Sequence, residues 1–146
     1  MAAPTYTWAF AYDLFGNRVP KIATLEASSN LETKIGTALI ATGGQVDEAT
    51  ASVQLFLGLA AEKTAAALTA GDPITVELAF PGAVYKGTAD ADASALSGFS
   101  GKTGDFNSDG SMDVGDTANG CLCVLRTEDS GLTVFCTINA SRMAAI

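Results

Sequence analysis

Short apolar runs separated by turn residues dominate the hydrophobic pattern of this chain. Residues 74–80 alternate apolar and polar positions, which is typical of a half-buried strand. Residues 121–125 and 132–138 flank a Glu-Asp-Ser-Gly turn and predict a hairpin. Three further runs also read as strands: residues 35–40, 53–59 and 83–86. About seven or eight short strands with regular turn signals predict a mainly β fold, either a compact barrel or a sandwich.

Helical signals are sparse. Residues 62–70 have good helix propensity, but the Gly71-Asp72-Pro73 break limits them to one or two turns. A second short helix is conceivable over residues 91–96, within a stretch of small and polar residues. We therefore expect at most one short helix in the fold.

The N-terminal segment carries an aromatic residue at every second position. In an extended chain, the rings would share one side; these candidate contact residues are Tyr6, Trp8, Phe10 and Tyr12. The chain is therefore divided into an extended arm over residues 1–18 and a single β-rich domain over residues 19–146. Two interpretations stay open: the strand lies in the core of its own domain, or it docks on a neighbouring subunit.

Composition excludes several classes of function. The 146 residues contain no histidine, which removes Ser-His-Asp and Cys-His catalysis and histidine-ligated metals. The net charge of −8 argues against binding nucleic acid or acidic membranes. Neither a signal peptide nor an apolar run of the roughly 20 residues that a membrane span needs is evident. We expect a protein that is made in a cytoplasm and binds neither nucleic acid nor membrane.

An acidic stretch over residues 105–116 has the spacing of a calcium-binding loop. Oxygen ligands occur at loop positions 1, 3, 5, 9 and 12 with glycine at position 6, and the candidate calcium ligands are Asp105, Asn107, Asp109 and Asp116. The last position holds Asp instead of the usual Glu, and the preceding residues 97–104 lack the pattern of a flanking helix. The alternative is a turn between two short strands, because Asn-Ser-Asp-Gly favours turns.

The three cysteines, Cys121, Cys123 and Cys136, are expected to be free and buried structural thiols. Cys121 and Cys123 occupy alternate strand positions, so a three-thiolate metal site is the other interpretation, although zinc prefers four ligands. A catalytic cysteine would require a base, and the chain offers only carboxylates for this role. We expect no catalytic, cofactor-binding or metal-binding residue and no enzymatic activity.

Several short motifs occur in an order that resembles a known protein family. In chain order they are Asn30-Leu31-Glu32, Val46-Asp47-Glu48-Ala49-Thr50, Leu57-Gly58-Leu59-Ala60-Ala61-Glu62, Pro81-Gly82-Ala83-Val84-Tyr85, Asp105-Phe106-Asn107-Ser108-Asp109-Gly110 and Asp116-Thr117-Ala118-Asn119-Gly120-Cys121-Leu122. Over most of residues 25–139 this order resembles the small head decoration, or cement, proteins of tailed bacteriophages. None of the motifs is catalytic.

The resemblance implies a mostly β domain that binds the outside of an assembled capsid and reinforces it. Its partners would be the major capsid protein and other copies of itself, and it would reside on the virion surface after synthesis in the host cytoplasm. The aromatic segment has the character of a docking arm. The alternative function is a calcium-dependent binding module, with carbohydrate as a candidate ligand.

Overall fold

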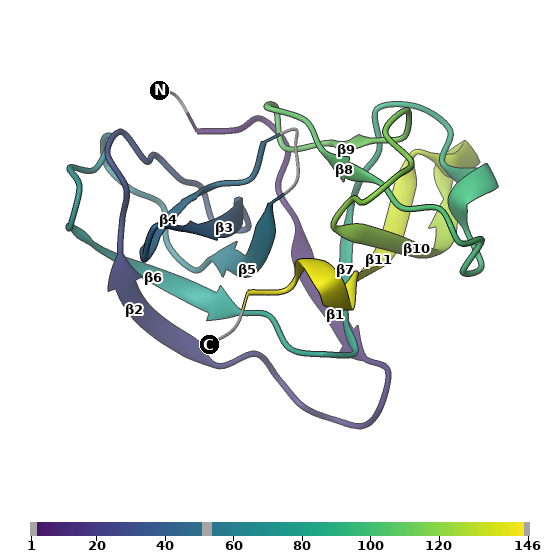
Figure 1. The fold of residues 1–146 in the computed structure, drawn as a ribbon, viewed down its shortest axis with the longest axis horizontal. Helices are drawn as coiled ribbons and strands as arrows, with labels where there is room; N and C mark the ends of the chain where they lie inside the picture. Colours follow the sequence, from purple (N-terminus) through teal and green to yellow (C-terminus); the bar gives the residue numbers. More distant parts are fainter. Residues whose placement is uncertain (1–2, 51–53, 145–146) are drawn as a thin grey trace.

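The computed structural model describes residues 3–50 and 54–144, which fold into three antiparallel sheets (Figure 1). The strands are β1 (Ala9–Asp13), β2 (Ile22–Glu26), β3 (Ala38–Thr42), β4 (Gln45–Glu48), β5 (Leu55–Ala60), β6 (Pro73–Leu78), β7 (Ala83–Thr88), β8 (Asp105–Phe106), β9 (Met112–Asp113), β10 (Leu122–Glu128) and β11 (Thr133–Ile138). One sheet has the order β1-β7-β11-β10, the second has the order β2-β6-β5-β3-β4, and β8 and β9 form a small hairpin. This confirms the predicted mainly β sandwich of short strands.

Helical structure in the described residues is confined to three single 3-10 turns, η1 (Ser94–Leu96), η2 (Asp129–Gly131) and η3 (Ala140–Arg142). The first of them falls within the short helix considered over residues 91–96. The helix predicted over residues 62–70 is wrong, because this segment is irregular. Leu68 instead exchanges backbone hydrogen bonds with the segment around Leu31 and packs on the core, and a helix of this length has too few internal hydrogen bonds to compete.

The main core lies between the two large sheets and the β8–β9 hairpin. Its centre is a group of aromatic rings in mutual contact: the Phe56 ring stacks on Phe106 at 5.8 Å, and it meets Tyr85 edge-on at 5.7 Å. These three side chains come from three different sheets. The aromatic group therefore joins the sheets, and each contact of this kind adds about 0.5–1.5 kcal/mol beyond simple burial.

A second core lies inside the five-stranded sheet, which curls until its outer strands approach each other (Figure 1). Ser28, just after β2, donates its N–H to the carbonyl of Val46 in β4 at 2.8 Å. Strand β5 is buried on both faces, with Phe56 in the main core and Leu57 in the second core. This explains why the sequence of β5 is a continuous apolar run without alternation.

The N-terminal segment is built into the main core. Strand β1 pairs with β7, and Trp8 is only 4% exposed. Its indole Nε1 donates to the carbonyl of Gly110 at 2.8 Å, across 102 residues of sequence, and its ring meets Phe106 edge-on at 5.6 Å. The segment thus places Trp8 in the core of its own domain, whereas Ala9, Ala11 and Tyr12 of β1 are exposed, so docking on a neighbour stays a prediction.

The N-terminal segment occupies space that is free because three residues next to it are glycines. A Cβ at Gly36 or Gly110 would collide with the backbone carbonyl of Trp8 or Tyr6, respectively, and both glycines have a positive φ of 90°. A Cβ at Gly87, in β7, would collide with the six-membered ring of Trp8. The N-terminal strand therefore fits because side chains are missing on three elements that are distant in sequence.

We predict that Gly87→Ala destabilises the fold by about 1–3 kcal/mol, because the added methyl group overpacks the Trp8 ring. Gly16→Ala is the matched control, since the nearest atom to its Cβ would be Asp13 Oδ2 at an ordinary 3.7 Å. The free energy of unfolding from urea denaturation checks both variants. Equal free energies of unfolding for the two variants would contradict the packing of the Trp8 ring against Gly87.

Candidate functional site

The four aromatic residues singled out by sequence have different environments. Trp8 is buried, Phe10 packs against the main core, and Tyr6 and Tyr12 are exposed. The expectation that all four rings share one side is wrong, because β1 has an irregular register between Phe10 and Tyr12. A bulge there turns Tyr12 to the other face. Of these four described residues, Tyr6 and Tyr12 are the ones whose rings are exposed for contact with another protein.

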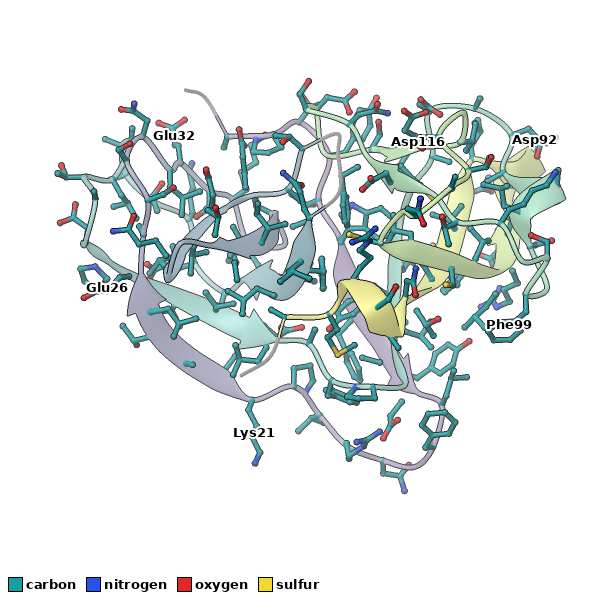
Figure 2. The ribbon with its side chains drawn as sticks, viewed as in Figure 1. Lys21, Glu26, Glu32, Asp92, Phe99 and Asp116 are labelled. Atoms are coloured by element: carbon teal, nitrogen blue, oxygen red, sulfur yellow. The ribbon has the colours of Figure 1, made fainter. Side chains whose placement is uncertain are left out.

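Exposed apolar side chains gather instead around the loop between β1 and β2. Phe15 is 77% exposed and Leu14 is also exposed, and across from them Phe99 is 67% exposed. These residues form the rim of an apolar cleft of about 560 Å³, whose deeper walls include Ile138 and Met143. We call it the Phe15–Phe99 cleft; Figure 2 shows Phe99 at the periphery of the molecule. Exposed rings beside an apolar cleft are a common feature of protein-binding surfaces.

The loop that carries Phe15 is organised by one carboxylate. Asp13 accepts hydrogen bonds from the backbone N–H groups of Phe15 and Arg18 at 3.0 and 3.2 Å, and from Arg18 Nε at 2.8 Å. Arg18 Nη2 also donates to the carbonyl of Pro81 at 2.6 Å, and the guanidinium lies 4.6 Å from the centre of the Phe80 ring. The Arg18 guanidinium and the Phe15 N–H lower the pKa of Asp13 to about 2. Phe15 thus projects into solvent from an ordered loop.

The opposite rim is held in a strained backbone conformation. Phe99 has a φ of 57°, in the left-handed region that bulky side chains avoid. Hydrogen bonds on both sides of it fix the loop: the Gly98 N–H donates to Leu125 at 3.1 Å, and Ser100 Oγ donates to Leu96 at 3.0 Å. Such a conformation costs on the order of 1–3 kcal/mol and tends to occur at functional positions. The backbone conformation that exposes the Phe99 ring therefore lowers the stability of the fold.

Sequence reasoning did not identify Phe15 and Phe99 as candidate contact residues. Phe15 lies in a stretch that reads as a polar turn, and Phe99 lies in a Ser-Gly-Phe-Ser-Gly loop. The available signal was a single aromatic residue in each loop, where no strand or helix periodicity would bury it.

The acidic residues 105–116 form the β8–β9 hairpin and its flanks. Asp105 is buried on β8 opposite Asp113, while Asp109 Oδ1 accepts hydrogen bonds from Ser111 N and Oγ at 2.9 and 2.6 Å. Asn107 Nδ2 donates to Asp90 and to Ser111, both at 3.0 Å. The hairpin tip is therefore closed by its own side chains.

The hairpin tip also supports the N-terminal strand. The carbonyl of Asp109 accepts the N–H of Tyr6 at 2.8 Å, next to the bond between Gly110 and the Trp8 indole. Within residues 3–50 and 54–144, no group of three or more Cys, Asp and Glu side chains is arranged to hold a metal ion. The calcium loop stays the alternative hypothesis, and the observed contacts of residues 105–116 are structural.

All three cysteines are free, and Cys121 and Cys136 are buried. Burial raises the pKa of each thiol. The pKa of Cys121 rises to about 12, mainly through burial and, to a smaller extent, through the negative charge of Asp105. The thiols are therefore protonated at neutral pH, which makes them poor nucleophiles. Cys121 and Cys136 are packed core side chains, whereas the expectation of a buried thiol is wrong for Cys123, which is only partly buried.

The sequence matches no protein-family model and no curated protein. In the part of the chain that the structure describes, no helix has the length and apolar character required to cross a bilayer.

The Asp13–Arg18 pair predicts a pH-dependent stability. Because folding lowers the pKa of Asp13 from 3.8 to about 2, its contribution is complete above the unfolded value and is lost as the pH falls through the folded value. The Tm of the wild type should therefore exceed that of Asp13→Asn at neutral pH, and the difference should shrink between about pH 4 and pH 2. Thermal melts followed by circular dichroism measure this. A difference that stays constant over this range would contradict the prediction.

For the acidic hairpin, we predict that millimolar calcium leaves the Tm unchanged, because Asp109 is already engaged by Ser111. Asp92 accepts the same pair of hydrogen bonds from Ser94, at 2.9 and 2.6 Å, in a turn without calcium-loop spacing. Asp92→Asn is therefore the matched control for Asp109→Asn. A calcium-dependent rise in Tm that Asp109→Asn alone removes would establish the calcium loop.

Proposed function

We propose that this chain is a structural virion protein that binds the outer surface of an assembled phage capsid and stabilises it. The observation that carries the proposal is the Phe15–Phe99 cleft, where two aromatic rings are held in solvent by ordered loops. The order of short motifs along the chain, which resembles that of head decoration proteins, supplies the identity of the partner. The β-rich fold is compatible with such a role.

The cleft is suited to a protein partner rather than to a small polar ligand. Val19, further along the loop that carries Phe15, is also exposed and apolar. Arg18 and Lys21 are the basic residues in the same loop; because Asp13 already pairs with Arg18, Lys21 is the residue that adds positive charge beside the apolar surface. A complementary site on the capsid would present an apolar side chain bordered by acidic groups.

The energetics of docking follow from the exposed rings. Burying an aromatic side chain stabilises a complex by roughly 1.5–3 kcal/mol, so Phe15 and Phe99 act as anchors. Tyr6 and Tyr12 offer further contacts with the capsid or with other copies of the chain, whereas Trp8 and Phe10 support the strand from inside. A protein that touches several capsid subunits at once gains avidity, so each single contact need only be modest.

We predict that Phe15→Ser combined with Phe99→Ser weakens binding to expanded capsids at least tenfold, because two anchors are lost. The capsids would come from a tailed phage that carries this sequence, and co-sedimentation would measure binding. Ile35→Ser is the matched control, since Ile35 is 69% exposed but does not line the cleft. The variants should keep the wild-type Tm, because the three side chains contribute little to the core.

Two results would overturn the proposal. One is the absence of co-sedimentation between the wild-type protein and the capsids. The other is undiminished capsid binding by the double variant, which would exclude the cleft as the docking surface. Supporting data would include a rise in the capsid melting temperature on addition of the wild type and a smaller rise with the double variant.

A further inference from the structure

Strand β2 is an edge of the five-stranded sheet, and its outer side has a defined hydrogen-bonding register. The carbonyl of Lys21 accepts the N–H of Leu78, so Lys21 and every second residue after it direct their backbone groups toward β6. Pro73, which has no N–H to donate, pairs with Glu26 and fits this assignment. The N–H and C=O groups of Ile22 and Thr24 therefore point away from β6, toward the open side of the curled five-stranded sheet.

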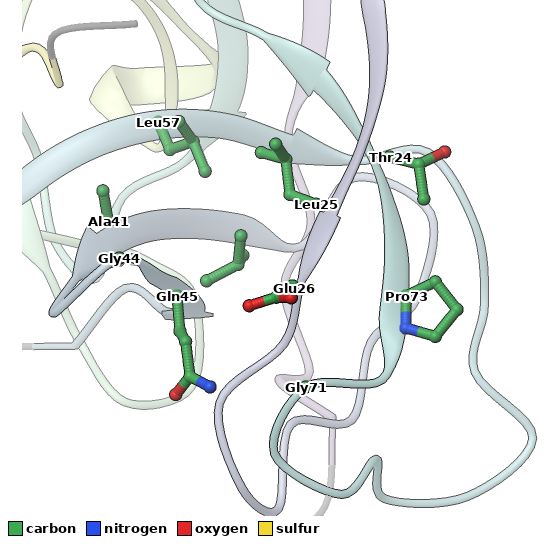
Figure 3. Close-up of a pocket in the computed structure, with 10 residues that line it drawn as sticks. Thr24, Leu25, Glu26, Ala41, Gly44, Gln45, Leu57, Gly71 and Pro73 are labelled. Atoms are coloured by element: carbon green, nitrogen blue, oxygen red, sulfur yellow. The ribbon is translucent and has the colours of Figure 1, made fainter.

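A groove runs along this open side. Strands β2 and β4 meet where Ser28 bonds to Val46, and the β3–β4 hairpin tip diverges from β2 beyond that point. The groove has a volume of about 580 Å³, and Leu25, Leu57 and Ala41 supply its apolar lining (Figure 3). Gly44 contributes no side chain at the tip of the hairpin. The groove is therefore bounded on one side by the free edge of β2, and its base is formed by apolar side chains.

Charge around the groove has one sign. Glu26 lines it directly and extends from β2 toward the hairpin in Figure 3. Asp72 lies in sequence between the lining residues Gly71 and Pro73, while none of the lining residues is Lys or Arg. Figure 2 shows Lys21 and Glu26 at opposite ends of β2, so the basic end of the strand faces the β1–β2 loop and the acidic end faces the groove.

We propose that this groove binds an extended segment of a partner protein, with alternating apolar residues and flanking Lys or Arg. The segment would pair with the outward groups of Ile22 and Thr24 as an added strand, and its apolar side chains would cover Leu25 and Leu57. Its basic flanks would meet Glu26 and the neighbouring acidic residues. Main-chain pairing supplies affinity in this mode, and the side chains supply selection. The site shares no lining residue with the Phe15–Phe99 cleft and does not depend on the capsid proposal.

The test uses the full chain and an array of eight-residue peptides with Val, Ile, Leu, Phe or Tyr at alternating positions. One half of the array ends in Lys or Arg and the other half ends in Glu. Basic-ended peptides should bind at least tenfold more tightly than acidic-ended ones. Amide shifts in NMR spectra of the labelled protein should concentrate on β2 and on the β3–β4 hairpin.

Two variants of the chain sharpen the test. Thr24→Pro removes an outward N–H while leaving the ladder to β6 intact, and it should reduce binding of the best peptide at least tenfold. Thr24→Val keeps that N–H and serves as the matched control. Glu26→Lys should abolish the preference for basic ends, and it provides an independent readout if Thr24→Pro fails to fold.

Several outcomes would overturn the proposal: no peptide binding at millimolar concentration, equal binding of basic-ended and acidic-ended peptides, or undiminished binding by a folded Thr24→Pro protein. A dimer that forms without peptide and is lost in Thr24→Pro would show that a second copy occupies the edge, which would also overturn it. Loss of peptide binding with intact capsid binding would separate this site from the Phe15–Phe99 cleft.

Discussion

The position of the Trp8 ring is the constraint on which the rest of this fold depends. The indole fills the space above Gly87 in β7, contacts Phe106 of the β8–β9 hairpin and donates a hydrogen bond to Gly110 at its tip. One side chain thus ties the first strand to elements about 80 and 100 residues later. Because interiors are close-packed, these elements must be in place together, which makes the N-terminal segment part of the cooperative core.

This constraint determines which aromatic residues remain available for contact. The core rings are satisfied by one another, so they cannot serve a partner without unfolding. Phe15 follows directly from β1, and the Asp13–Arg18 pair turns the chain so that the ring points outward. The proposed docking surface is consequently linked to the way β1 is anchored, because Trp8 lies in the core just before this strand and Phe15 is exposed just after it.

The sequence predicts the strands well because their signals are local. Alternation over residues 74–80 and the Gly-Gly and Ser-Gly turns correspond to β6 and to observed hairpins. The helix expected over residues 62–70 failed because Leu68 gains more from burial against the second core than from local propensity. The environment of Trp8 could not be predicted, since it depends on glycines at positions 36, 87 and 110 that only the fold brings together. For the same reason, the sequence does not show whether an aromatic side chain in a loop, such as Phe15 or Phe99, is buried or exposed.

The acidic excess also has a different meaning once the fold is known. In the β8–β9 hairpin, the Asp109 carboxylate accepts hydrogen bonds from Ser111. Some of the acidic residues therefore serve to shape turns. At the open side of the five-stranded sheet, by contrast, Glu26 is exposed beside an apolar groove and a free strand edge. An exposed edge is an aggregation hazard, and a charge of one sign blocks pairing with equally acidic copies of the chain. The same charge admits a basic segment, so negative charge at this edge would both prevent self-association and select a partner.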